Sequence, residues 1–318
     1  MELEAAPPAA TRQLSIDDVF RVIGEFGTYQ RWHYAKVVST QLSIAVCTLG
    51  MVFTNRPPLW RNLADPTPGS GDLTGVARLS EVPCDGDVSW AYVAPWQSVR
   101  SEWGLVCEHE WVSRLLDALF FVGFGFGATF FGKVSDARGR KRAHAASLSL
   151  AAIAMLLSAS APGVTSYAVC RCVCGVGVGG VNVVAYVWAC EPIGQAWQSR
   201  AGIMSAITFA VAAGVVLPLL SLLLPGWRGL NAASAAICVP HILWLALTAD
   251  ESPRWLLGAG QLDAARAVLW QVARVNGAIS DAEMTDLDAE MTRAGGGGAA
   301  AGEDPPTASP TEARTEPR

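Results

Sequence analysis

Long apolar runs alternate with shorter polar connections along most of the chain. Each run is close to the roughly 20 residues that a helix needs to cross the hydrocarbon core of a bilayer. The runs occupy residues 36–54, 115–131, 143–161, 164–189, 201–224 and 229–249. This pattern predicts an all-α membrane protein with six transmembrane helices, one of them in residues 36–54 and five in residues 113–249.

The polar segments between and beyond these runs divide the rest of the chain. Residues 1–35 form an N-terminal segment, and residues 55–112, rich in Pro, Gly and Asp, form a long loop after the first span. Residues 250–279 contain a polar motif and an amphipathic helix. Residues 280–318 are acidic and then rich in Gly, Ala, Pro and Thr, a composition that predicts disorder.

Apolar residues recur at helical spacing near the start of the chain, at Ile16, Val19, Phe20 and Ile23. This spacing fits an amphipathic helix lying on the face of a membrane. An ordinary solvated leader is the other interpretation, and the pattern alone leaves both open.

A basic cluster separates the second and third spans. Residues 132–142 contain five Lys or Arg residues in a short turn. Cytoplasmic connections carry an excess of Lys and Arg, so this turn is expected to be cytoplasmic. Counting spans then places the loop of residues 55–112 outside and both termini inside, in a multi-pass protein expected in the plasma membrane.

The composition supports a membrane protein, with 51% hydrophobic and only 16% charged residues. The net charge of −5 arises mainly from the N-terminal segment and the tail, and no basic stripe suggests nucleic-acid binding.

The outer loop contains two cysteines, Cys84 and Cys107. An oxidising compartment permits a disulfide between them, although the sequence does not give the distance between their Cα atoms. A bonded pair and two free thiols are therefore both open.

No motif points to an enzyme, a cofactor or a metal. Residues 175–180 match the dinucleotide-binding pattern G-x-G-x-x-G, but no β-strand precedes them, so their glycines are expected to allow close helix packing. The glycines at 123, 125 and 127 are interpreted in the same way. The alternating cysteines of residues 170–174 point in different directions on a helix, which is the wrong spacing for zinc.

Two ionisable residues lie within the predicted spans, Asp117 and Arg171. A charge in hydrocarbon is costly unless it meets a partner or water. Asp117 fits either the outer interface or a functional position. Arg171 fits either a buried structural role or the wall of a polar pathway.

Several ordered motifs resemble those of the major facilitator superfamily. The basic turn resembles the motif between the second and third spans, G-x-L-x-D-R-x-G-R-R/K, with Gly132, Asp136, Gly139, Arg140 and Lys141. Arg171 with Gly175 and Gly177 resembles the fourth-span motif. Glu191 with Arg200, and Glu251 with Arg254 in residues 251–256, resemble the motifs after the fourth and sixth spans.

Two further motifs narrow the resemblance to the organic cation, anion and carnitine transporters, solute carrier family 22. These are residues 24–27 with Gln30, and residues 102–107. The resemblance covers residues 16–277 and implies the N-terminal six-span half of a transporter for small organic solutes. In such a protein two halves rock around a central site near the bilayer midplane.

The resemblance also implies a gating role for the cytoplasmic charges. Asp136 and Glu191 are expected to accept hydrogen bonds from Arg140, Arg200 or Arg254, in pairs that break and re-form as the halves move. Tyr186 corresponds to an aromatic position of the family's fourth span and is a candidate wall of the pocket, where its ring would meet an organic cation.

Some features depart from the family pattern. Ala137 replaces a basic residue, Phe121 replaces a polar one, and the second six-span half is not present in this sequence. A transporter of an organic ion or a related small organic solute, working by alternating access, is therefore the main hypothesis, and pairing with a second six-span half or a full-length relative stays open. A receptor-like or partner-modulating membrane protein that does not transport is the alternative.

Overall fold

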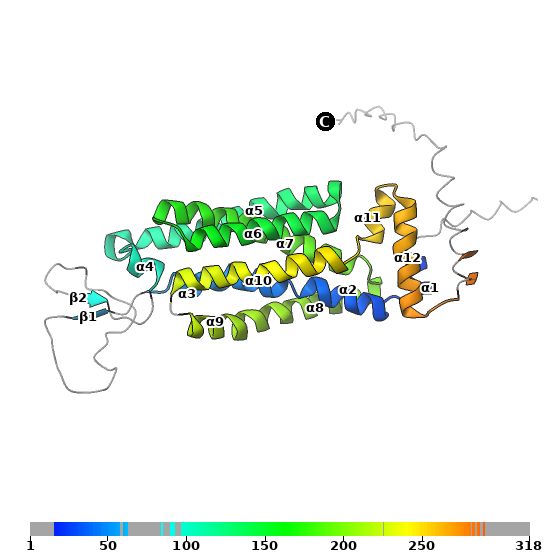
Figure 1. The fold of residues 1–318 in the computed structure, drawn as a ribbon, viewed down its shortest axis with the longest axis horizontal. Helices are drawn as coiled ribbons and strands as arrows, with labels where there is room; N and C mark the ends of the chain where they lie inside the picture. The colour runs from blue at the N-terminus through cyan, green and yellow to red at the C-terminus, as the bar shows by residue number, and fades with distance from the viewer. Residues whose placement is uncertain are drawn as a thin grey trace, which may run out of the picture.

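The described part of the chain forms a bundle of long helices with a smaller helical layer at one end (Figure 1). The computed structural model describes residues 16–57, 60–62, 84, 90–92, 97–224, 226–280, 282–283, 285–286 and 289. We call the end that carries α1, α11 and α12 the α12 end, and the opposite end the α4 end.

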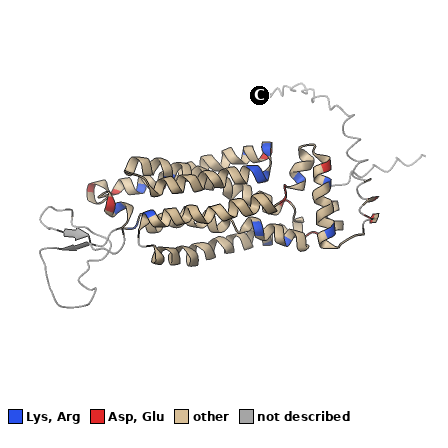
Figure 2. Cartoon of the chain, in the orientation of Figure 1, with Lys and Arg blue, Asp and Glu red and all other residues tan. Residues whose placement is uncertain are grey.

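Six helical segments in the described residues are long and apolar enough to cross a membrane, which confirms the predicted fold class. They span Thr28–Thr54, Cys107–Arg138, Arg140–Ala159, Val164–Cys190, Gln195–Leu223 and Trp227–Thr248. Charged side chains gather at the two ends of the bundle, and its long middle is almost free of them (Figure 2).

The first spanning segment consists of two helices, α2 (Thr28–Val38) and α3 (Gln41–Thr54), and begins earlier than the predicted run. Ser39 and Thr40 form the break between them. Their hydroxyls donate to the carbonyls of Lys36 and Val37 at 2.6 Å, which satisfies acceptors at the end of α2.

The basic turn is shorter than predicted. Helix α5 (Glu110–Arg138) continues through most of it, and α6 (Arg140–Ala159) begins two residues later. Gly139 alone connects them, with φ at 99°, a conformation that favours glycine.

Helix α7 (Val164–Cys190) lies at the centre of the bundle and packs mainly against α5 and α6. A Cβ atom at Gly127 of α5 would overlap the Val176 carbonyl of α7, and one at Gly175 of α7 would overlap the Phe120 carbonyl of α5. These glycines therefore allow two backbones to approach closely, as predicted. Gly125 is the exception, because nothing lies within 4 Å of the position of its Cβ.

The last two spanning segments complete the bundle. The fifth contains α8 (Gln195–Val211), a short π-helix η3 (Ala212–Val216) and α9 (Leu217–Leu223), and the sixth is α10 (Trp227–Thr248).

At the α12 end, α1 (Ile16–Ile23) packs against α12 (Leu262–Asn276) beside α11 (Pro253–Gly258). The apolar face of α1, with Phe20 and Ile23, is fully buried in a cluster with Leu269 and Val272. This face is therefore occupied by protein, and α1 does not offer it to a membrane surface. The predicted amphipathic helix exists, but its partner is α12.

The α4 end holds two short antiparallel strands that the sequence did not predict, β1 (Trp60–Asn62) and β2 (Trp90–Tyr92). The short helix α4 (Val99–Glu102) and the 3-10 turn η2 (Cys107–His109) lead into α5. A disulfide joins Cys84 to Cys107, whose Cα atoms are 5.6 Å apart. The expectation of disorder for residues 280–318 lies almost entirely outside the described residues.

Candidate functional site

A charge cluster centred on Arg140 lies where α5, α6 and α7 meet at the α12 end. The Arg140 guanidinium donates to Glu191 at 2.9 to 3.3 Å and to Asp136 at 2.6 Å. The side chains of Arg140 and Glu191 are 12% and 14% exposed, whereas that of Asp136 is 75% exposed. Water competes least for the pair of Arg140 with Glu191, so this pair contributes more to the stability of the fold than an exposed pair would.

Glu251 caps the start of α6. Its carboxylate accepts from the backbone N–H groups of Arg140 and Lys141 at 2.9 to 3.2 Å, where the helix presents unpaired donors and the positive end of its dipole. On the same side, the Trp255 indole donates to the Asp136 carbonyl at 2.7 Å, near the end of α5. The segment after the sixth span therefore ties α5 to α6.

Arg254 connects this cluster to the N-terminal layer. Its Nε donates to the Glu191 carbonyl at 2.7 Å, and its Nη2 forms an ion pair with Asp17 of α1. Arg200 lies apart from the cluster, with its guanidinium 4.6 Å from the centre of the Trp197 ring. Asp17 is the member of the network that the sequence motifs did not indicate.

A cavity of about 430 Å³ opens on one face of the bundle, between α3, α5, α7 and α8. It is lined by Gln41, Ile44, Thr48, Phe121, Phe124, Asn182, Tyr186, Gly202, Ser205, Ala206 and Phe209. Tyr186, the residue that the resemblance suggested as a pocket wall, lies among these lining residues.

The lining of this cavity carries no ionised side chain among the described residues. Its polar groups are amides and hydroxyls. Gln41 donates to the Ser205 hydroxyl at 2.9 Å, and the Thr48 hydroxyl is buried without a hydrogen-bond partner in the structure. Gln41, Asn182 and Ser205 were missed from the sequence, although amides inside apolar runs were a visible signal.

Arg171 is buried in the core, with its side chain directed at α3, α5 and α6. It donates to the Cys47 carbonyl at 3.3 Å and to the Met155 sulfur at 3.7 Å, and its guanidinium lies 4.6 Å from the centre of the Phe120 ring. One guanidinium nitrogen, Nη2, has no hydrogen-bond partner in the structure. These contacts favour the structural interpretation of Arg171 over a place in the cavity wall.

Asp117 lies on α5 near the α4 end, where it accepts from Asn55 at 3.0 Å. It is not among the residues that line the cavity. The described residues also hold no group of three or more His, Cys, Asp or Glu side chains arranged to bind a metal ion.

The bundle of six spanning segments, with its open cavity between α3, α5, α7 and α8, can be compared with known proteins. Residues 97–297 match the family described as sugar (and other) transporter. The chain belongs to this family. The resemblance to the major facilitator superfamily, with relatives in solute carrier family 22, is therefore confirmed.

The curated relatives of the chain support the same family. Organic cation/carnitine transporter 4 of Arabidopsis thaliana is 33% identical over 272 residues, which cover 83% of this chain and 49% of the relative. Solute carrier family 22 member 3 of Rattus norvegicus is 30% identical, covering 87% of this chain and 59% of the relative. The chain spans about half the length of the first two curated relatives it matches.

Solved structures share the fold. A double-tryptophan mutant of XylE matches with a TM-score of 0.56 at 15% identity, covering 78% of this chain and 50% of that one. The major facilitator superfamily proton:xylose symporter XylE matches with a TM-score of 0.53 at 14% identity, covering 87% of this chain and 54% of that one. The chain is a multi-pass membrane protein with the fold of one part of such a transporter.

Proposed function

We propose that this chain acts in the transmembrane transport of a small organic ion or a related small organic solute, by alternating access. The observation that carries the proposal is the cavity of about 430 Å³, which a polar and aromatic face of the bundle presents to one side. Among the amides of this lining, that of Asn182 is only half-buried, and an amide that faces hydrocarbon is costly because lipid offers it no hydrogen bonds.

A second six-span half is the partner that such a face requires. In transporters built from two repeats the solute site lies at the interface between the repeats. The cavity of this chain is one wall of that site, and another six-span half covers it from the other side.

The lining favours solutes that aromatic rings and neutral hydrogen-bonding groups can hold. Phe121, Phe124, Tyr186 and Phe209 offer ring faces, which attract organic cations through the ring quadrupole. Asn182 offers both hydrogen-bond donors and acceptors. Names of relatives that include organic cation and carnitine transporters support the same class of solute.

The charge cluster around Arg140 is proposed to stabilise one state of the transporter. The pairs of Arg140 with Asp136 and Glu191 lie at the ends of three helices, where a relative movement would break them. The excess of Lys and Arg in this region supports placing the α12 end, and both termini, in the cytoplasm. The plasma membrane is the proposed location, and no catalytic step is part of the proposal.

Uptake of radiolabelled solutes by cells that express the chain tests this function. Three probes differ in charge: a small quaternary ammonium ion, an aromatic carboxylate and a neutral hexose. Uptake of one class is expected, and Asn182→Ala or Tyr186→Ala should reduce it. Ile203→Ala is the matched control, because Ile203 is 62% exposed on α8 and does not line the cavity. Uptake of all three probes at the level of untransfected cells would contradict the proposal.

A further inference from the structure

Two cavities lie one after the other along the bundle, and the first, fourth and fifth spanning segments contribute lining residues to both. The second has a volume of about 10 Å³, which is close to the space that one water molecule needs. It is lined by Tyr34, Val37, Val38, Gln41, Ala185, Tyr186, Ala189, Cys190 and Ser205. Gln41, Tyr186 and Ser205 line both cavities.

The order of the cavities follows from the helices that line them. Along α7, Asn182 lines only the large cavity, Tyr186 lines both, and Cys190 lines only the small one. Along α2 and α3 the order is the same, from Thr48 through Gln41 to Tyr34. Each step is about one or two helical turns. The small cavity therefore lies nearer the α12 end.

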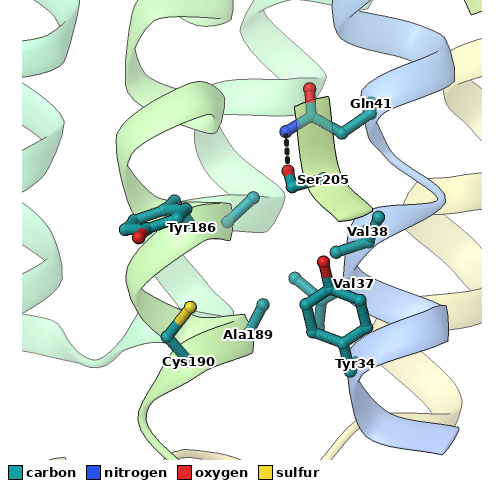
Figure 3. A pocket seen from close by; sticks show the side chains of 9 residues that line it. Tyr34, Val37, Val38, Gln41, Tyr186, Ala189, Cys190 and Ser205 are labelled. Atoms are coloured by element: carbon teal, nitrogen blue, oxygen red, sulfur yellow. Dashed lines mark hydrogen bonds between the residues drawn. The ribbon is translucent and has the colours of Figure 1, made fainter. Parts of the chain in front are cut away.

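The hydrogen bond between Gln41 and Ser205 lies at the boundary between the two cavities. Gln41 Nε2 donates to Ser205 Oγ at 2.9 Å and so joins α3 to α8 (Figure 3). The side chains of Val38 and Tyr34 lie on one side of this bond in the figure, together with Cys190. On that same side, the Tyr34 hydroxyl donates to the Ala201 carbonyl and so joins α2 to α8.

Both segments that carry the bond depart from a regular α-helix nearby. Gln41 is the first residue after the break at Ser39 and Thr40, where the Thr40 N–H bonds to the Val37 carbonyl in a tighter 3-10 pattern. Ser205 lies in α8, two turns before the π-helix η3. Such irregularities inside long helices often mark hinges. Small rotations at these points would separate the two side chains.

We infer that Gln41 and Ser205 form an inner gate, a hydrogen-bonded pair that closes the floor of the large cavity towards the α12 end. With the pair joined, only a water-sized space continues beneath it. With the pair separated, the two cavities become one path along α7, from Asn182 past Tyr186 to Cys190. Which solute uses this path rests on the proposed function. The gate itself does not, since water and small reagents follow the same route.

The native thiol of Cys190 offers a direct probe of the gate. Intact cells expressing the chain are treated from outside with a charged methanethiosulfonate reagent that does not cross membranes. Peptide mass spectrometry then measures the labelling of Cys190. A Thr48→Cys variant reports whether the reagent reaches the large cavity above the pair.

The gate predicts three results. Thr48→Cys is labelled, and Cys190 is protected in the wild-type chain. Gln41→Ala and Ser205→Ala each increase the labelling rate of Cys190 by roughly fivefold, the change in an opening equilibrium expected from losing one hydrogen bond. The double variant adds little to either single change, because both remove the same bond.

Ile44→Ala is the matched control, since Ile44 lines only the large cavity and makes no side-chain hydrogen bond. This variant should leave Cys190 as protected as in the wild type. A size-exclusion profile of every variant checks that it is folded. Labelling of Cys190 at the same rate in the wild type and both gate variants would overturn the inference, as would a Thr48→Cys thiol that the reagent never reaches. Because no transport is measured, loss of uptake with these labelling results intact would count against the proposed function alone.

Discussion

The side-chain amide of Asn276, in the last turn of α12, accepts a hydrogen bond from the backbone N–H of Tyr29 in the first turn of α2, at 3.0 Å. The same amide donates to the Ile23 carbonyl at 2.9 Å and to the Gln30 side chain at 3.0 Å. One residue therefore fixes the connection between α1 and the first span.

Replacing Asn276 should release this connection. Asn276→Ala removes three hydrogen bonds and leaves the N–H of Tyr29 without its partner, a loss of about 1–3 kcal/mol. Hydrogen exchange of residues 16–30 should become faster, while exchange in α5 and α7 stays unchanged. Val275→Ala is the control, since Val275 is exposed. Equal protection of residues 16–30 in both variants would show that the apolar contacts of α1 suffice alone.

The pair of Arg140 with Glu191 should depend on the shape of the guanidinium as well as on its charge. Lysine keeps the positive charge but cannot donate in parallel to Glu191 and Asp136. Arg140→Lys should therefore lower the stability of the chain in detergent by about 1–3 kcal/mol. Arg138→Lys, at the exposed end of α5, should have no effect in the same thermal unfolding assay. A matching decrease in both variants would mean that the effect is not specific to the pair.

The close contact of α5 with α7 gives a prediction with a built-in control. Gly127→Leu forces the two backbones apart and should cost at least about 1–3 kcal/mol, the typical effect of overpacking a core. Gly125→Leu, two residues away on the open side of α5, should leave stability nearly unchanged. Midpoints of thermal unfolding in detergent measure both, and an equal loss at Gly125 would mean that α5 has another partner there.

Glu102 should make the α4 end sensitive to acid. Burial raises the pKa of its carboxyl group, but hydrogen bonds from Arg228 and Trp227 outweigh this effect and hold the pKa below its usual value. A lowered pKa in the folded state contributes stability above the unfolded value of about 4.3, and this contribution is lost as the pH falls through the folded pKa.

The measurement is the unfolding midpoint of the chain between pH 7 and pH 3. The wild type should lose stability below about pH 4.3 more steeply than Glu102→Gln, whose amide does not titrate in this range. Glu108→Gln, at an exposed position on η2, should follow the wild type. Parallel curves for Glu102→Gln and the wild type would contradict the assigned role.

The sequence predicted the six spans because apolar residues in bilayer-length runs leave few alternatives for the backbone. The motif residues that form ion pairs, such as Arg140 and Glu191, were also predicted, because their charges stand out in an apolar chain. The break before Gln41 was missed, since hydrophobicity continues across Ser39 and Thr40 and their hydroxyls satisfy the backbone locally.

Other features depend on contacts that no local pattern reveals. The neutral pair of Gln41 and Ser205 is separated by 164 residues and joins only when α3 meets α8. The partner of α1 could not be chosen from its own spacing, because a membrane surface and α12 both satisfy an amphipathic helix. In the structure, the apolar face of α1 packs against α12.

Trans-stimulation in membrane vesicles tests alternating access most directly. Vesicles from cells expressing the chain are loaded with the unlabelled solute that the uptake assay identifies, and entry of labelled solute is followed. Alternating access predicts faster entry into loaded than into empty vesicles, and loss of this acceleration in the Asp136→Asn/Arg140→Ala variant. Entry that ignores the internal solute, or that is equal in the variant and the wild type, would contradict it.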